Sequence, residues 1–206
     1  MILACASDAE PVAWTNGGGI TRELLRLPED GDDWALRISV ADIDADGPFS
    51  RFPGISRSFA VIAGAGVRLR WPTRALHLQT GDAPLHFDGG DAPECTLFDG
   101  PTRDLNIMVR SSLAKATVVA AALGDEQWAL RTLGMGFFAL RPLRLHGPLA
   151  APVEMPALSL CWQAPPFGPT RPWGIAPSSA PGLEQEHTAG LPGYWISLHE
   201  PARPRR

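Results

Sequence analysis

The sequence contains little of what metal, disulfide and cofactor sites are built from. Its three cysteines, Cys5, Cys95 and Cys161, are far apart and lack CxxC spacing, so they indicate neither a disulfide framework nor a zinc site. The five histidines never occur as HxH or HxxxH pairs, and we predict no metal site and no cofactor. This cysteine usage is typical of the reducing cytosol, so we expect a cytoplasmic protein.

Positive charge is also scarce. Lysine and arginine total 18 against 22 aspartates and glutamates, which argues against a nucleic-acid partner. Lys115 is the only lysine. Arginine can donate two parallel hydrogen bonds to a carboxylate. A preference for GC-rich codons would give the same excess of arginine over lysine. No apolar run approaches the length of a membrane span, so we expect no membrane partner.

Catalytic and nucleotide motifs are incomplete. There is no GxSxG elbow, and no catalytic residue is predicted. The segment "GMGFFA" (134–139) mimics a dinucleotide fingerprint but Pro142 interrupts the helix it should open, and we interpret it as a turn. The segment "DIDADG" (42–47) begins like a calcium loop but has Pro53 where the glutamate ligand belongs, which favours an acidic turn.

Three consecutive glycines stand in "WTNGGGITREL" (14–24). The segment lacks the lysine and the helix of a phosphate-binding loop, and the residues after the glycines are strand-like. We interpret it as a tight turn whose backbone approaches a small ligand or another strand closely, so that a bulky residue at Gly18 would damage folding or ligand binding.

Short β-rich runs separated by turn residues predict an all-β chain, either a sandwich or barrels. The run 115–123 is compatible with a strand or a short helix, and the Pro/Gly-rich segment 165–182 is expected to be a loop. A boundary near Ser111 would give two halves of similar size. The expected strands are 34–43, two within 57–71, 76–78, 84–87, 95–98, 105–110, 115–123, 128–133, 136–145, 157–162 and 194–199.

Several strands carry polar and small residues on one face. Arg37 and Ser39 alternate with apolar neighbours, Asn106 and Met108 share a face, and so do Thr21 and Glu23. In an antiparallel sheet such a face usually meets solvent. In a closed barrel it can instead line an interior cavity for a small ligand.

The segments "WTNGGGITREL", "WALRISVADIDADGPFSRFPGISRSFAVIAGAGVRL", "GDAPLHFDG" and "LFDGPTRDLNIMVR" resemble the HutD/Ves family of bacterial proteins, in order over residues 14–110. The resemblance implies a bicupin: two small antiparallel β-barrels of the RmlC-like cupin type. The first barrel would be residues 1–112, with the family motifs, and the second would be the divergent residues 113–206.

The resemblance also implies a function linked to histidine utilisation or stress response. Family members in histidine-utilisation clusters are regarded as non-enzymatic regulators that bind a small anionic metabolite of the formylglutamate or urocanate class. Two alternatives stay open: a metal-free or atypical cupin enzyme (an isomerase or hydrolase) with Glu23 as its general base, and a purely structural module with a plugged barrel. A homodimer also stays open.

The family pattern implies a ligand site in the first barrel. Arg37 and Arg57 are the candidates for a carboxylate, because the guanidinium donates two parallel hydrogen bonds. A salt bridge from Arg57 to Asp104 that merely closes the barrel is the alternative role for that arginine. The ligand-binding candidates are Asn16, Gly18, Thr21, Arg37, Ser39, Phe49, Arg57, Asn106 and Met108.

Overall fold

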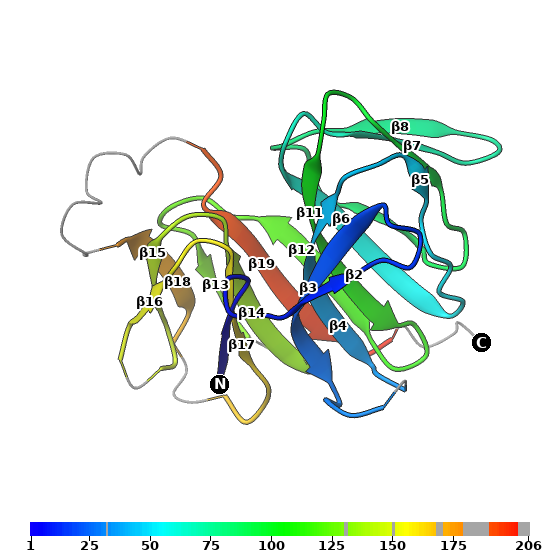
Figure 1. Cartoon of the computed structure of the whole chain (residues 1–206). Coiled ribbons are helices and arrows are strands. Elements are labelled where there is room, and N and C mark those ends of the chain that lie inside the picture. The colour runs from blue at the N-terminus through cyan, green and yellow to red at the C-terminus, as the bar shows by residue number, and fades with distance from the viewer. Residues whose placement is uncertain (32, 130–131, 150, 168–170, 179–189, 202–206) are drawn as a thin grey trace. The chain divides into compact units, whose positions relative to one another are not determined.

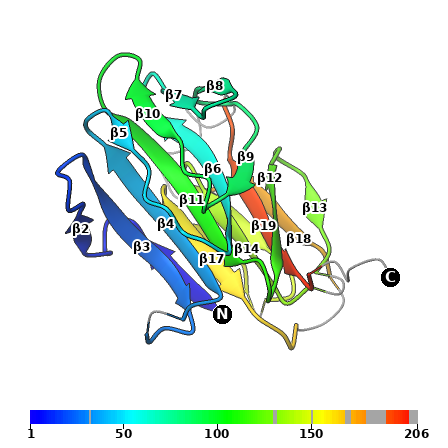
Figure 2. The ribbon, with the colours of Figure 1, turned by 90° about the vertical axis from the view of Figure 1, so that its right-hand side faces the viewer.

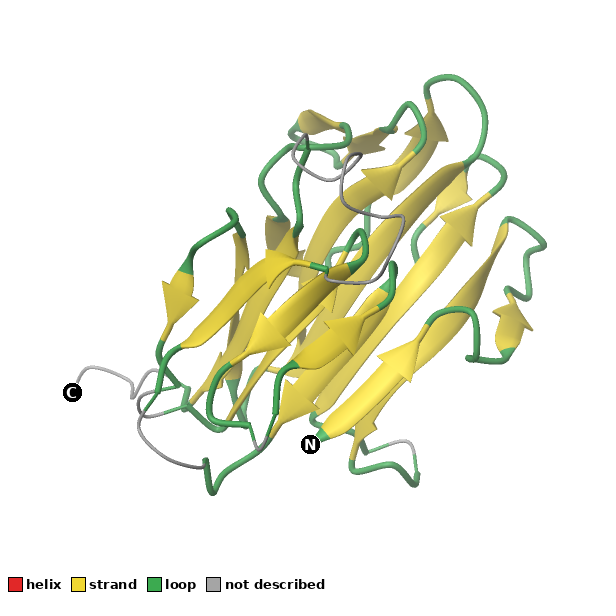
Figure 3. Cartoon of the chain, turned by 90° about the vertical axis from the view of Figure 1, so that its left-hand side faces the viewer, coloured by secondary structure: helices red, strands yellow, loops and turns green. Residues whose placement is uncertain are grey.

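The computed structural model describes residues 1–31, 33–129, 132–149, 151–167, 171–178 and 190–201 (Figure 1). Every regular element within these ranges is a β-strand, and neighbouring strands pair in the antiparallel direction (Figure 3). The segment 115–123, compatible with strand or helix, forms a strand over its first six residues. Over the same ranges, no helix is long and apolar enough to cross a membrane.

The strands form two compact units, and the first unit lies in the chain between the two segments of the second. The first unit is built on Ala9–Lys115, and the second consists of Met1–Asp8 and Ala116–Glu200. The strand bounds are β1 (Ile2–Cys5), β2 (Pro11–Ala13), β3 (Gly19–Leu27), β4 (Leu36–Ile43), β5 (Gly47–Pro48), β6 (Ile55–Ala63), β7 (Val67–Arg70), β8 (Ala75–Leu78), β9 (Leu85–Asp88), β10 (Glu94–Leu97), β11 (Thr102–Arg110), β12 (Lys115–Ala120), β13 (Glu126–Gln127), β14 (Gly134–Ala139), β15 (Leu143–His146), β16 (Val153–Met155), β17 (Ser159–Gln163), β18 (Trp173–Pro177) and β19 (Gly193–His199).

The first unit is a six-stranded sheet, β2-β3-β4-β11-β6-β9, and a four-stranded sheet, β5-β10-β7-β8. Figure 2 shows the long strands β3, β4, β11 and β6 side by side. Residues from both sheets form one apolar cluster, in which Phe59 of β6 meets Val67 and Leu69 of β7. All three side chains are fully excluded from solvent. This cluster is the core that holds the two sheets of the first unit together.

The second unit has a five-stranded sheet, β1-β17-β14-β19-β12, and a four-stranded sheet, β13-β18-β15-β16. We expected residues 1–8 in the first barrel, whereas Ile2 pairs with Trp162 and Cys5 with Ser159, so β1 is an edge strand of the second unit. Large side chains fill this unit: Phe137, Trp173 and Trp195 are 0–3% exposed and lie in one cluster.

The interpretation of "GMGFFA" as a turn is wrong. Residues 134–139 form β14, a central strand buried at all six positions. Its glycines serve close packing, because a Cβ at Gly134 or Gly136 would overlap the ring of Trp162 on the neighbouring strand. The glycines suggested a loop in the sequence, whereas in the structure they leave space for the bulky ring of Trp162 beside a strand.

Two other expectations also need correction. The segment 165–182 is not a loop throughout, because residues 173–177 form β18 and bury Trp173 and Ile175; residues 168–170 and 179–182 lie outside the described part. The run 136–145 divides into two strands at the segment containing Pro142, which has no backbone N–H for a ladder. Within 128–133, the described residues 128–129 and 132–133 are not in a strand.

The three glycines differ in their roles. Gly17 has a φ of 71° and makes the turn. Gly18 donates its N–H to Asn16 Oδ1, and its carbonyl accepts from the backbone of Asp44. Gly19 begins β3, and a Cβ there would overlap the carbonyl oxygen of Asp42 on β4. The close approach to another strand that we predicted for this turn is made at Gly19.

We therefore predict that Gly19→Ala destabilises the protein more than Gly18→Ala. Overlap with a strand backbone costs roughly 1–3 kcal/mol. At Gly18 a new Cβ would lie 3.3 Å from Asn16 Oδ1, the end of a side chain that can move. Urea denaturation followed by fluorescence measures both variants. Equal stability of the two would show that the β3–β4 approach is not tight.

Candidate functional site

The six-stranded sheet of the first unit presents three rows of side chains on one face. The first row runs across the strands from Arg26 to Arg37, Met108 and Arg57. The second row is Glu23, Ser39, Asn106 and Phe59, and the third is Thr21, Ala41, Asp104 and Val61. The polar faces expected along β3, β4 and β11 are therefore one continuous face.

A β-bulge at Leu24 places both Glu23 and Arg26 on this face. Glu23 pairs with Ser39 and Leu25 with Ile38, so Leu24 is an extra residue in β3. In a regular strand, residues three apart point to opposite faces, and one inserted residue returns them to the same face. The adjacent leucines 24 and 25 are accordingly both buried.

A cavity of about 570 Å³ lies over this face of the sheet. Strict alternation in β3 would have placed Arg26 on the opposite face of the sheet. The sequence signal for the bulge was the pair of adjacent leucines, Leu24 and Leu25, which are both buried. Eight of the nine residues predicted from the sequence line the cavity, and Gly18 does not; the eight are Asn16, Thr21, Arg37, Ser39, Phe49, Arg57, Asn106 and Met108. Lining residues that the sequence prediction omitted include Trp14, Glu23, Arg26 and Phe52.

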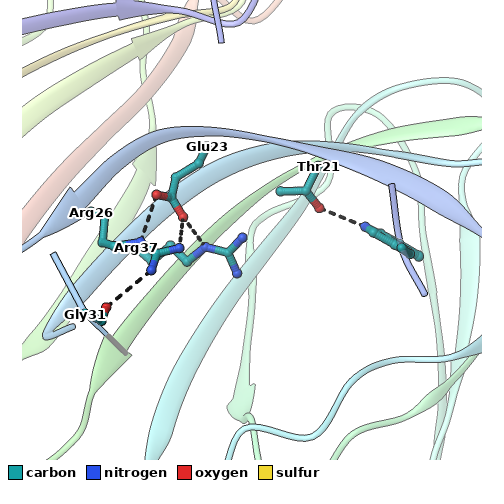
Figure 4. A network of polar contacts seen from close by, with 6 residues as sticks. Thr21, Glu23, Arg26, Gly31 and Arg37 are labelled. Atoms are coloured by element: carbon teal, nitrogen blue, oxygen red, sulfur yellow. Dashed lines mark hydrogen bonds and ion pairs between the residues drawn. The ribbon is translucent and has the colours of Figure 1, made fainter. Parts of the chain in front are cut away.

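Glu23 holds two of the cavity's arginines (Figure 4). Arg37 donates from Nε to Glu23 Oε2 at 2.6 Å, and Arg26 donates from Nε and Nη2 at 2.8 Å. Arg26 and Arg37 are directly opposite each other on neighbouring strands, where like charges repel. Burial acts to raise the pKa of Glu23, but the hydrogen bonds from Arg26 and Arg37 outweigh it and hold that pKa below its usual value.

Arg57 has a different environment. It is 7% exposed, and its Nε donates to Asn106 Oδ1 at 2.7 Å. The ring of Phe49 lies against the guanidinium, 4.4 Å from Cζ to the ring centroid, and Phe87 lies at 5.5 Å. Among the described residues, no hydrogen bond or ion pair forms from the Nη atoms of Arg57. The guanidinium is thus fixed at its Nε, while its Nη atoms remain without a partner in the described part of the chain.

Asp104 reaches Arg57 only through Asn106. Asn106 Nδ2 donates to Asp104 Oδ1, and no direct ion pair between Asp104 and Arg57 is found in the described part of the chain. The direct salt bridge weighed from the sequence is therefore absent there. Burial lowers the pKa of Arg57 to about 10, and burial raises the pKa of Asp104 to about 8, in each case against the attraction of the other group. Both shifts favour the neutral forms, so these groups do not behave as a compensated ion pair.

The cavity is positively charged and partly apolar. Three arginines (26, 37 and 57) face one carboxylate, a formal excess of two positive charges in a chain whose net charge is −4. Trp14, Phe49, Phe52 and Met108 supply the apolar wall. Trp14 is held by a hydrogen bond from its Nε1 to Thr21 Oγ1 at 2.8 Å. Such a wall with a few fixed polar groups is typical of small-ligand sites.

The cavity residues do not suit the metal ion that many cupins hold. Divalent cations take imidazole, carboxylate or thiolate ligands, whereas this wall has arginines and a single carboxylate that is already bonded to two of them. Within the described ranges no group of three or more His, Cys, Asp or Glu side chains could hold a metal ion. His86, a lone strand histidine, instead contacts the hydroxyl of Ser58 at 2.7 Å.

The raised pKa of Asp104 predicts a specific pH dependence of stability. Because its folded pKa lies above the unfolded value near 4, the folded protein binds more protons than the unfolded chain, and this contribution is lost as pH rises toward about 8. Asp104→Asn mimics the neutral acid. We expect the variant to gain stability relative to the parent between pH 4 and pH 8, measured by urea denaturation across that range. A variant that instead loses stability relative to the parent as pH rises would indicate a carboxylate stabilised by pairing.

The comparisons with known proteins identify the family. The family model for HutD matches residues 6–147. The chain is 37% identical over 109 residues to protein Ves of Citrobacter koseri and 38% identical over 110 residues to an uncharacterized 21.2 kDa protein in the hutC 3′ region of Pseudomonas putida. Each alignment covers 52% of this chain and 57% or 56% of the relative, so the chain spans about half the length of the curated relatives it matches.

Solved structures cover nearly the whole chain. HutD from Pseudomonas fluorescens has a TM-score of 0.76 at 23% identity, covering 97% of this chain and 98% of its own. A conserved protein of unknown function from Pseudomonas aeruginosa has a TM-score of 0.78 at 23% identity, covering 96% and 97%. A variant of Bacillus subtilis oxalate decarboxylase has a TM-score of 0.60 at 8% identity, covering 98% and 78%.

These likenesses show the fold alone, and with the two all-β units they confirm the expected bicupin. The family model spans well over half of the chain. The chain belongs to the HutD family.

Proposed function

We propose that this protein is a non-enzymatic binding protein for a small carboxylate and that it modulates histidine utilisation. The ligand class is that of formylglutamate or urocanate. Each combines a carboxylate with a compact body that a cavity of about 570 Å³ accommodates. Arg57 and Arg37 bind the anionic groups, Ser39 and Asn106 orient polar atoms, and the aromatic wall contacts the remainder.

The observation that carries this proposal is the buried charge of Arg57. A buried cation is costly unless it is paired. The carboxyl group of Asp104 is separated from it by an amide and has its pKa raised by burial to about 8, so it is mostly neutral at pH 7. Arg57 lines a cavity whose wall has an excess of positive charge, and its Nη atoms have no hydrogen-bond partner among the described residues. A ligand carboxylate would supply the missing negative charge through two parallel hydrogen bonds.

The relatives support the link to histidine utilisation. One solved neighbour is HutD from Pseudomonas fluorescens, and the Pseudomonas putida relative is encoded in the 3′ region of hutC.

The two alternatives from the sequence are less well supported. The enzymatic alternative needs Glu23 as a general base, with a pKa raised toward neutrality. Glu23 does line the cavity, but its hydrogen bonds to Arg26 and Arg37 hold its pKa below the usual value, and it is therefore a poor base at pH 7. A purely structural module would have its first barrel filled with side chains, whereas this one contains the cavity.

Calorimetric titration at pH 7 with N-formylglutamate, urocanate, glutamate and formate tests the proposal. We expect at least one to bind, and Arg57→Met to weaken that binding by at least about 30-fold, because removing one partner of a buried charge pair costs roughly 2–5 kcal/mol. Arg37→Met should weaken it as well.

Arg68→Met is the matched control. Arg68 is an exposed arginine on β7 that does not line the cavity, so its loss makes the same charge change elsewhere. The control should bind as the parent does. If none of the four compounds bound the parent protein, the carboxylate class would be ruled out.

A further inference from the structure

A chain of buried hydrogen bonds leads from the cavity wall to a residue outside the wall, in the third row of the same sheet face. Arg57 and Asn106 line the cavity, whereas Asp104 does not. The amide of Asn106 bridges them: Oδ1 accepts from Arg57 Nε at 2.7 Å, and Nδ2 donates to Asp104 Oδ1. The three residues are 7%, 4% and 1% exposed.

The chemistry of the bridge fixes its direction. A guanidinium can only donate, so Asn106 must turn Oδ1 toward Arg57, and its Nδ2 then needs an acceptor on the other side. Asp104 supplies that acceptor whether or not it is ionised, because a neutral carboxyl keeps a carbonyl oxygen. With its Nε edge bonded and one face covered by Phe49, Arg57 has only its Nη edge for a ligand.

We propose that Asp104 is a positioning and specificity-determining residue for anion binding: it orients Arg57 through Asn106, and its neutral form leaves the guanidinium charge available to a ligand carboxylate. Binding of the anion is thereby coupled to a proton held on Asp104. This inference rests on the carboxylate-binding function proposed above and adds a residue outside the cavity to it.

The groups around Asp104 favour this neutral form. From β4, Asp42 adds a second negative charge; it stays ionised because it is paired with Arg22 and Arg103, whose hydrogen bonds outweigh burial and hold its pKa low. From β10, Cys95 contributes a neutral thiol, since burial raises its pKa to about 12. From β6, Arg57 favours ionisation, as does the N–H that Asn106 donates, and burial still raises the pKa of Asp104 to about 8.

Ionised Asp104 would compete with the ligand. A carboxylate behind Arg57 neutralises the guanidinium from one side and repels a second carboxylate arriving from the cavity. The affinity for an anion should therefore fall as pH rises through the pKa of Asp104. One coupled proton limits the fall to about tenfold per pH unit.

The test is calorimetric titration with formate and with N-formylglutamate at pH 6, 7, 8 and 9, on the parent and on Asp104→Asn. Neither ligand titrates in this range, since N-formylglutamate has no free amine, and Arg57, with a pKa of about 10, stays charged. We expect parent and variant to agree within about twofold at pH 6 and 7. At pH 9 the parent should bind several-fold more weakly than at pH 7 and more weakly than the variant.

Asp44→Asn is the control, because Asp44 is an exposed turn residue and the substitution makes the same charge change. It should keep the parent's pH profile. Parallel profiles for the parent and Asp104→Asn would overturn the inference and leave the proposed function standing, as would weaker binding by Asp104→Asn at every pH. No binding by the parent at any pH would overturn both.

If Asp104→Asn fails to fold, a measurement on the parent protein alone still tests the inference. Titration at pH 8.5 in two buffers of different ionisation enthalpy counts the protons exchanged on binding. The inference predicts uptake of a substantial fraction of one proton per carboxylate bound. Binding with no proton uptake would overturn it.

Discussion

The site depends on one buried guanidinium, that of Arg57. Its position follows from the register of β6 on β11, which sets Arg57 opposite Met108 and diagonal to Asn106. Asn106 then fixes the Nε edge, and Phe49 covers one face. Strand pairing, amide orientation and aromatic packing together fix the guanidinium and leave its Nη atoms without a partner among the described residues, so under the proposed function the guanidinium is oriented before any ligand arrives.

The other arginines on this sheet show how unusual that arrangement is. Arg22 and Arg103 share the carboxylate of Asp42, and Arg26 and Arg37 share that of Glu23. In both clusters the carboxylate has a lowered pKa, as expected for direct pairing. Beside Arg57, the pKa of Asp104 is raised instead. Arg57 thus differs from the arginines of this sheet that share a carboxylate directly, and under the proposed function its charge serves an anionic ligand.

Sequence reasoning found the faces of the sheet but could not decide what they face. Alternation in 34–43 and 105–110 put Arg37 and Ser39 on one shared face and Asn106 and Met108 on another, and the family resemblance added Arg57. Whether such a face meets solvent or a cavity depends on the second sheet, which alternation does not encode.

Sequence analysis missed Arg26 as a cavity residue because a bulge shifts the alternation of β3 by one residue. The segment "GMGFFA" was misread as a turn because its glycines make room for the ring of Trp162, which lies on another strand. The link from Arg57 to Asp104 was foreseen only as a direct salt bridge, because side-chain spacing along β11 cannot show that an amide intervenes.

The most direct test of this account observes the guanidinium itself. Nitrogen-15 NMR of Arg57, assigned by comparison with the Arg57→Met variant, reports on each Nη group during a titration with N-formylglutamate at pH 7. Two parallel hydrogen bonds to a carboxylate should slow rotation of the guanidinium and shift the Nη signals while the Nε signal, already bonded to Asn106, changes little. Saturable binding of the ligand with unchanged Nη signals from Arg57 would contradict the account.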